Sequence, residues 1–476
     1  MLFYIAARAV EASVVHNLWT YFGQSFYHAA IIPLLALTVV LAWYARPSTS
    51  EEMPRKFANF QYTYLVVWCV CVAADWLQGP YVYALYSAYG FTGQEIAQLF
   101  VAGFASSLVF GCFVGSLADR FGRKLCCMAY CAFYIASCIT KHWQHYWILM
   151  LGRVLGGVAT SLIFSCFECW MVSEHLQRFR FSSGLLSYMF GLMFTFMYFV
   201  AIASGLAAQL AADSFTFAPV VEGSLIHTGG YCVPFDLAII CLVVGAVLIA
   251  LLWEENYGSE ECKDGHCGLF TNISESVRML AADAGALRVC VIVAAFEGTM
   301  YAFVFNWTPA LESKTMPLPH GVVFSLFMMA CMSGASASTL VSRMAKPTMR
   351  LAVVCGIGIL VFGICAFTAG GASPIPCFLA FLAFEFCVGV YFPTIGIVKS
   401  EIVPEHVRGT MYNLYRVPLN AVVVCLLLTD ISMVVSFQLC ACLLTVALVA
   451  VFSISMQNHP LKLGLGGLDL ECPKQS

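Results

Sequence analysis

Residues 115–124 read GSLADRFGRK and lie between two long apolar runs, one ending near residue 116 and one beginning at residue 125. This stretch is too short to form a domain, and its three basic side chains cannot lie in hydrocarbon. It therefore predicts a tight connection between two membrane helices. We expect Gly115 to let the two helices approach closely, and Asp119 to accept hydrogen bonds from helix-terminal N–H groups.

The composition of the chain is that of a membrane protein. Of its 476 residues, 61% are hydrophobic and only 10% are charged, whereas a soluble domain carries roughly 25% charged residues. No basic stripe larger than a loop points to nucleic acid. Most of the 23 cysteines lie inside apolar runs, where they resemble small hydrophobic residues and predict neither a disulfide framework nor a metal site.

The apolar runs predict thirteen transmembrane helices in two six-helix bundles, with one extra helix at the N-terminus. Nearly all of the 23 basic residues then fall on one face of the membrane, which places the N-terminus outside and the C-terminus in the cytoplasm. The expected divisions are an N-terminal segment 1–59 with the extra helix at about 28–44 and a linker, a first bundle 60–252, a cytoplasmic central loop 253–286, a second bundle 287–455 and a cytoplasmic tail 456–476.

Weak internal repeats support two related halves. VAADWLQGPY, from Val72, parallels VAAFEGTMY, from Val293, and each places a carboxylate within a span, Asp75 and Glu297. SEH at residues 173–175 is followed by Arg178, and PEH at residues 404–406 by Arg408. Similar offsets at two separate places favour duplication of a six-helix unit.

Charged residues inside the spans are the candidates for function. Each costs roughly 2.5–3.5 kcal/mol at the bilayer centre, so such residues usually face a cavity. The alternative is that they form structural ion pairs between helices. An arginine binds an oxyanion well because its planar fork donates two parallel hydrogen bonds and keeps its charge. The expected substrate-binding residues are Arg153, Arg416, Asn420, Trp76, Gln78, Tyr81 and Asn306.

Two further groups of residues have expected roles. We expect three buried carboxylates to carry protons during transport: Asp75, Glu297 and Glu385. We expect the gate to comprise Gly115, Asp119, Arg120, Gly122, Arg123, Lys124 and Glu168. Glu168 lies too far along its helix from Arg153 to pair with it directly, and is expected to meet Arg120 or Arg123.

Several motifs resemble those of a known family. The pattern G-x-L-x-D-R-x-G-R-K is similar to the loop between the second and third helices of major facilitator superfamily transporters, and GRVLGGVATS around Arg153 is similar to their fourth-helix arginine motif. AADWLQGPYVYALY, FECWMVSEH, FEGTMYAFVFNWTPALE and NLYRVPLN resemble the molybdate-anion transporters of that superfamily, over nearly all of residues 61–451. The resemblance implies an all-α membrane protein with the major facilitator superfamily fold and high-affinity uptake of molybdate across the plasma membrane.

The residues alone leave other functions open. Four carboxylates within the spans against two arginines, Arg153 and Arg416, also suit a proton-coupled carrier of organic cations. A membrane receptor or scaffold that transports nothing is a third class. No nucleotide-binding loop or catalytic triad occurs, so we expect a gradient-driven carrier that is not an enzyme and needs no cofactor. The expected partners are a small anion and the lipid bilayer, without nucleic acid, and we expect a monomer.

Overall fold

The computed structural model describes residues 22–257, 282–313, 317–368, 373–403, 408–429 and 431–456, together with residues 278, 280 and 371. Most of the expected central loop, residues 253–286, and almost all of the tail, residues 456–476, lie outside this range. The described residues form thirteen helices of at least 18 residues. Eleven helical segments among them are long and apolar enough to cross a membrane. The chain is therefore an all-α membrane protein.

The first half contains six long helices whose buried faces share one hydrophobic core. They are α3 (Arg55–Gln78), α5 (Gly93–Phe121), α6 (Arg123–Thr140), α7 (Tyr146–Ser173), α8 (Ser183–Ser214) and α9 (Val233–Leu252). The short elements between them are η1 (Gly79–Tyr81), α4 (Val82–Ala88), the π-helical turn η2 (Glu174–Arg178), the strands β1 (Ala218–Pro219) and β2 (His227–Thr228), and η3 (Gly230–Cys232).

The second half has its own core, again shared by six long helices. They are α12 (Ala284–Leu311), α13 (His320–Val341), α14 (Pro347–Thr368), α15 (Ile375–Ile402), α16 (Arg408–Leu428) and α17 (Met433–Met456). Large apolar side chains such as Leu251, Leu360 and Phe367 are exposed on the outside of both halves. Their exposure is expected of a surface that faces lipid.

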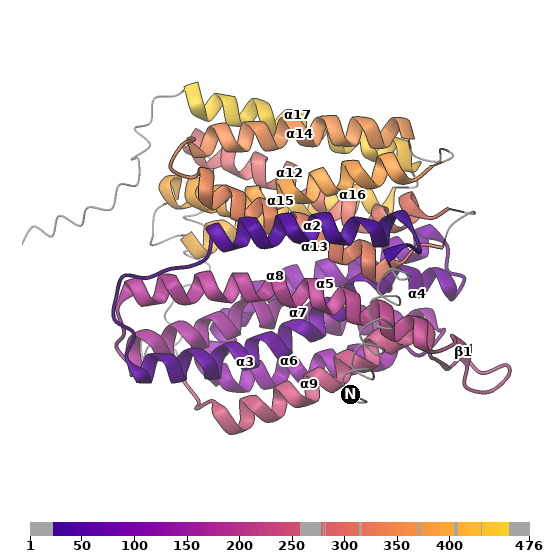
Figure 1. The fold of residues 1–476 in the computed structure, drawn as a ribbon, viewed down its shortest axis with the longest axis horizontal. Helices are drawn as coiled ribbons and strands as arrows, with labels where there is room; N and C mark the ends of the chain where they lie inside the picture. Colours follow the sequence, from indigo (N-terminus) through magenta and orange to yellow (C-terminus); the bar gives the residue numbers. More distant parts are fainter. Residues whose placement is uncertain are drawn as a thin grey trace, which may run out of the picture.

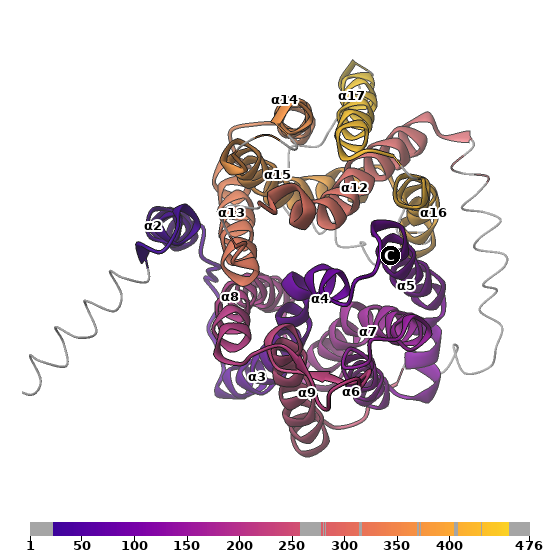
Figure 2. The same cartoon turned by 90° about the vertical axis from the view of Figure 1, so that its right-hand side faces the viewer.

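The two halves meet along two seams, α8 with α13 and α5 with α16 (Figures 1 and 2). At the first seam Gly205 and Gly321 bring the backbones together, since a Cβ on Gly205 would lie 2.8 Å from the Gly321 carbonyl oxygen. The Ser325 hydroxyl donates to the Ile202 carbonyl 2.8 Å away. These residues lie toward the end of the bundle opposite residues 115–124. The halves are therefore closed at this opposite end.

The leading helix α2 (Phe26–Tyr44) packs against the second half, beside α13 (Figure 2). The Thr38 hydroxyl is 3.1 Å from the Met329 carbonyl oxygen and 3.0 Å from the Ser333 hydroxyl. Residues 45–54 then return along the first half, where the Ser182 hydroxyl donates to the Glu51 carboxylate. The expected extra helix is thus present, and its linker connects the two halves.

An ion pair in the connection between α6 and α7, residues 141–145, should make the stability of the protein depend on pH. Nε2 of His142 lies 3.0 Å from the Asp236 carboxylate at the start of α9. Burial lowers the pKa of His142. The hydrogen bond to Asp236, the charge of Asp236 and two backbone carbonyls raise this pKa by more than burial lowers it, so it lies above its usual value. Because the pKa of His142 is raised in the folded protein, its pairing with Asp236 stabilises the fold fully below about pH 6.5. This stabilisation is lost as the pH rises through the folded-state pKa.

We therefore expect His142→Gln to lower the melting temperature of the purified protein at pH 5.5 and to have little effect at pH 8.5. The difference corresponds to about 0.5–1 kcal/mol, because the Asp236 side chain is half exposed. Thermal unfolding in detergent across this pH range measures it, with the exposed His145→Gln as control. An equal loss at both pH values would contradict the assignment.

Candidate functional site

Arg153 presents unpaired donors within the first half. It lies two turns from the start of α7 and is half-buried. Its Nε donates to the Leu99 carbonyl at 3.1 Å, and its guanidinium carbon lies 4.9 Å from the centre of the Phe100 ring. The guanidinium occupies space left by Gly103, where a Cβ would come within 2.5 Å of Nη2. Among the described residues its terminal N–H groups have no acceptor, so they can bind an anion.

Arg416 lies at the seam between α5 and α16. Its Nη1 is 3.5 Å from the place where a Cβ on Gly111 would stand, and its guanidinium lies beside Tyr301. Asn420, one turn later, donates to the Arg416 carbonyl at 2.6 Å. This bond uses the Asn420 amide within its own helix. Arg153 and Arg416 thus lie against different parts of α5, eight residues apart on that helix (Gly103 and Gly111).

Trp76 and Gln78, at the end of α3, differ in their free donors. The Trp76 ring packs against Phe324 of the other half, with centroids 5.9 Å apart. Its indole nitrogen Nε1 is buried and has no acceptor among the described residues. Gln78 is buried, and its amide donates to the Ala74 carbonyl at 2.9 Å. Trp76 therefore keeps its single N–H available to a ligand, whereas Gln78 uses one of its two amide N–H groups within its own helix.

Tyr81 and Asn306 make contacts that hold helices together. The Tyr81 hydroxyl donates to Oε1 of Gln209 at 3.1 Å, and the same oxygen accepts from the Gly321 N–H at 2.9 Å. Asn306 is buried against α17, where Nδ2 donates to the Ser436 hydroxyl at 3.2 Å. Tyr81 therefore belongs to the closed end between the halves. Asn306 packs inside the second half, and its expected role in substrate binding stays a prediction.

Asp75 is held by a hydroxyl and not by a cation. It lies in α3 and accepts a hydrogen bond from the Tyr134 hydroxyl of α6. No ion pair to Asp75 occurs among the described residues. Arg153 is close enough to act electrostatically on Tyr134. Asp75 and Arg153 therefore share Tyr134 as a common neighbour.

Glu297 has a counter-ion that the sequence did not predict. Its Oε1 lies 3.5 Å from Nζ of Lys399 on α15, and it accepts from the Tyr391 hydroxyl at 3.1 Å. Lys399 lies in the last turn of α15, and its side chain is only 17% exposed. This ion pair is the structural alternative that the sequence left open.

Glu385 has no such counter-ion within the described part of the chain. It is 5% exposed on α15 and lies beside the Cys331 thiol of α13. Asp75 and Glu385 therefore have no cationic partner among the described residues, whereas Glu297 is paired with Lys399.

The 115–124 segment forms the last turns of α5, a turn at Gly122 and the start of α6. Asp119 accepts from Arg123, with Nη2 at 2.7 Å and Nε at 3.1 Å. Gly122 has φ of +109°, a conformation that favours glycine. A Cβ on Gly115 would meet no atom within 4 Å. This corrects the expected close approach at Gly115.

The carboxylate that caps α6 is Glu255, not Asp119 as expected. Its two oxygens accept from the backbone N–H groups of Lys124 at 2.7 Å and Leu125 at 3.0 Å. Nζ of Lys124 in turn donates to the carbonyls of Ala250 at 3.0 Å and Trp253 at 2.7 Å, at the end of α9. The N-terminus of α6 and the C-terminus of α9 thus neutralise each other's unpaired backbone groups.

We expect Glu255→Ala to destabilise the purified protein by about 1 kcal/mol, because the first N–H groups of α6 lose a charged acceptor. Thermal unfolding in detergent measures the loss. Glu222→Ala, at an exposed position between β1 and β2, is the matched control. Equal melting temperatures for the two variants would show that water caps α6 as well as Glu255 does.

Glu168 and Arg120 do not join the pair formed by Asp119 and Arg123. Glu168 is exposed on α7, and no ion pair to it occurs in the described ranges. The Arg120 guanidinium lies 5.5 Å from the centre of the Phe121 ring. The expected contact between Glu168 and a basic residue of the 115–124 segment is therefore not formed in this conformation.

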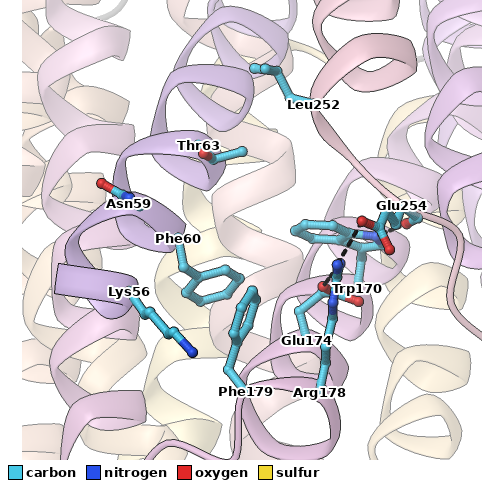
Figure 3. Close-up of a pocket in the computed structure, with 10 residues that line it drawn as sticks. All are labelled: Lys56, Asn59, Phe60, Thr63, Trp170, Glu174, Arg178, Phe179, Leu252 and Glu254. Atoms are coloured by element: carbon cyan, nitrogen blue, oxygen red, sulfur yellow. Dashed lines mark hydrogen bonds and ion pairs between the residues drawn. The ribbon is translucent and has the colours of Figure 1, made fainter. Parts of the chain in front are cut away.

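A pocket of about 370 Å³ lies at the 115–124 end of the first half (Figure 3). Arg178 is paired there with Glu174 at 3.0 Å and Glu254 at 2.6 Å. The ion pair of Glu174 and Arg178 could have been predicted from the sequence, because residues four apart lie on the same face of a helix. The residues lining the pocket are Lys56, Asn59, Phe60, Thr63, Trp170, Glu174, Arg178, Phe179, Leu252 and Glu254.

Three residues near Arg153 were missed by sequence reasoning: Tyr86, Tyr134 and Lys141. Lys141 follows α6 directly, yet its side chain is only 1% exposed. Nζ of Lys141 donates to the Tyr86 hydroxyl at 2.7 Å. The available signal was weak, because a lysine at the end of a span usually extends toward water.

Solved transporters share this fold at low sequence identity. A D-xylose-proton symporter superposes with a TM-score of 0.61 at 12% identity, covering 83% of this chain and 97% of that one. A POT family transporter in complex with 5-aminolevulinic acid superposes with a TM-score of 0.64 at 10% identity, covering 86% and 97%. These likenesses show the major facilitator superfamily fold.

The sequence also matches a family model and several named relatives. The model is described as sugar transporters with 12 transmembrane segments and matches residues 26–391. The molybdate-anion transporter of Xenopus laevis is 34% identical over 446 residues, covering 89% of this chain and 93% of that protein. The molybdate-anion transporter of Takifugu rubripes is 33% identical, covering 82% and 84%. The chain therefore belongs to the molybdate-anion transporter family of the major facilitator superfamily.

Proposed function

We propose that this protein takes up molybdate across the plasma membrane by alternating access. The observation that carries the proposal is Arg153, whose guanidinium lies within the first half with its terminal N–H groups unpaired in the described structure. Molybdate is a tetrahedral dianion, and its desolvation requires several donors and a fixed positive charge. The relatives named molybdate-anion transporters support this choice of oxyanion.

The 115–124 end lies in the cytoplasm in this proposal, following the distribution of basic residues. The N-terminus is then outside and the C-terminus inside. The contacts of Gly205 and Gly321 close the extracellular end, so the conformation faces inward. The pair of Asp119 and Arg123 would meet the other half only when the halves tilt and the cytoplasmic end closes.

Accumulation of molybdate in cells that express the chain tests this function. Intracellular molybdenum is measured by mass spectrometry after brief exposure to low molybdate concentrations, with an empty vector as reference. We expect saturable accumulation that tungstate inhibits. Labelled organic cations are tested in parallel. If they accumulate and molybdate does not, the substrate is an organic cation.

The proposed orientation is tested with an epitope at each end of the chain. In intact cells, antibody should reach only the epitope at the N-terminus.

Proton coupling is assigned to Asp75 and Glu385, because neither has a cationic partner among the described residues. We expect Asp75→Asn and Glu385→Gln to flatten the dependence of uptake on external pH more than they change affinity. Glu297→Gln should instead lower the rate and keep the pH dependence, since it breaks the ion pair of Glu297 with Lys399. Initial uptake between pH 5.5 and 8 at equal surface expression distinguishes the three. A flat profile for Glu297→Gln alone would reverse the assignment.

A further inference from the structure

Two thiols, those of Cys365 and Cys377, lie side by side in the second half. Cys365 is in the last turn of α14, and Cys377 is in the first turn of α15. Their sulfur atoms are 3.5 Å apart, although the residues are 12 positions apart in the sequence. Both side chains are buried, with 0% and 1% of their surface exposed. Because α14 packs against α15, this proximity is a consequence of the fold.

The distance between the two sulfur atoms is short enough for a bond to form. In this structure both residues are thiols in contact. A disulfide requires about 2.05 Å between its sulfur atoms, so the pair must close by roughly 1.5 Å. Rotation about the two Cα–Cβ bonds moves the sulfur atoms and leaves the helix backbones in place. Oxidation is therefore compatible with the packing of α14 on α15.

The pair lies at the end of the bundle opposite residues 115–124. Phe378, which follows Cys377, packs against Phe327 of α13 with ring centroids 6.0 Å apart. Phe327 is less than two turns from Gly321, which forms the closed end between the halves. The proposed orientation makes this end extracellular. Thiols on that side of the membrane fold in an oxidising compartment, where disulfides form and persist.

We propose that Cys365 and Cys377 form a disulfide that ties α14 to α15 at the extracellular end. The oxidant is a disulfide of the folding compartment. One cysteine thiolate attacks a sulfur of this oxidant and releases one thiol, and the other cysteine thiolate then attacks the mixed disulfide and releases the second. The two cysteines thus lose two electrons and two protons, and the oxidant leaves as two thiols.

Burial determines when this bond can form. A soluble oxidant or reductant does not reach either sulfur once α14 and α15 are packed, so the exchange precedes packing. The same burial then protects the bond from reduction. Phe378 also packs against Tyr27 at the start of α2, with ring centroids 4.9 Å apart. The bond would therefore hold together the end of α15 that carries α2 when the two halves separate there.

The test distinguishes thiols from disulfide sulfurs in the full chain, expressed in cells with a secretory pathway. The cells are lysed in denaturant with N-ethylmaleimide, which caps free thiols, and the protein is then reduced and treated with iodoacetamide. Mass spectrometry should find the iodoacetamide adduct on Cys365 and Cys377, and a peptide that links them before reduction. Cys127, equally buried but in the second turn of α6 at the 115–124 end, should carry only N-ethylmaleimide.

Thermal unfolding of the purified protein in detergent gives a second measurement. Cys365→Ala and Cys377→Ala should each lower the melting temperature by about 5 °C. The double variant should lose no more than either single variant, because one substitution already removes the bond. Cys442→Ala, at an exposed thiol of α17, should leave the melting temperature unchanged. Additive losses would overturn the proposal, since thiols that pack independently lose their contacts separately.

The labelling of the wild type decides the proposal even if no variant can be purified. N-ethylmaleimide on both Cys365 and Cys377, or a bond from either to another cysteine, overturns it. The inference rests on the proposed orientation, and the epitope experiment separates the two. Free thiols with an accessible N-terminal epitope overturn the disulfide and leave the orientation and the proposed uptake intact. Free thiols with an N-terminal epitope that antibody cannot reach overturn the disulfide and the orientation together.

Discussion

Arg153→Ala is expected to reduce molybdate uptake at least about 100-fold at unchanged surface expression, because the anion loses its paired N–H donors and a fixed charge. Arg153→Lys keeps the charge but not the planar fork, so it should raise the KM by about tenfold. Initial uptake against molybdate concentration, normalised to surface protein, measures both. Arg343→Ala, at an exposed arginine between α13 and α14, is the matched control.

Gly103 provides an independent check, since its substitution leaves the charge of Arg153 in place. A Cβ on Gly103 would come within 2.5 Å of Nη2, so Gly103→Ala must displace the guanidinium. We expect it to raise the KM as Arg153→Lys does. Gly356→Ala, at a helical glycine with no atom within 4 Å of a Cβ, should leave the KM unchanged. A normal KM for molybdate in Arg153→Ala would show that Arg153 is not part of the anion site.

Gly321→Val should block the cycle by preventing closure of the opposite end. A Cβ on Gly321 would meet the Gly205 carbonyl oxygen and lie 2.8 Å from the Gln209 nitrogen, and neither backbone atom can move without shifting α8. We expect uptake to fall more than about tenfold while the protein reaches the surface, since the outward-facing arrangement does not need this contact. Uptake and surface labelling of the same cells measure the two effects.

Accessibility from outside distinguishes such a conformational block from simple misfolding. Tyr83 packs against Phe305 of the other half, with ring centroids 5.5 Å apart. In a Tyr83→Cys background, Gly321→Val should make the new thiol reactive to an impermeant thiol reagent. The same cysteine in otherwise wild-type protein gives the reference. Gly356→Val tests the effect of a β-branched residue in a helix where space is free. Normal uptake in Gly321→Val would show that the end does not close this tightly during transport.

The sequence predicted the helices well because membrane spans depend on local properties. An apolar run of sufficient length forms a helix in lipid whatever its neighbours are, and the basic loops between runs mark their ends. The extra helix, expected at about 28–44, is Phe26–Tyr44 in the structure. The family resemblance likewise rested on contiguous motifs, and the named relatives confirm it.

The partners of charged residues could not be predicted because they depend on packing between distant segments. Glu255 reaches α6 across more than 120 residues of sequence, and nothing near it marks it as a cap. Lys399 pairs with Glu297 because α15 packs against α12, more than 100 residues away in sequence. Lys141 is buried because α4 covers it with Tyr86, a contact that hydropathy does not report. Whether such a residue faces water or protein is decided only by the tertiary fold.

The path of residues 45–54 has a mechanical consequence. They join α2, which packs against α13 of the second half, to α3 of the first, so the polypeptide itself restrains separation at the α8 and α13 seam. Ten residues can extend to at most about 35 Å, which allows motion and limits its amplitude. The α5 and α16 seam has no equivalent restraint within the described residues. Opening at the 115–124 end is thereby biased toward a hinge with its axis near α8 and α13, wider on one side of the molecule than on the other.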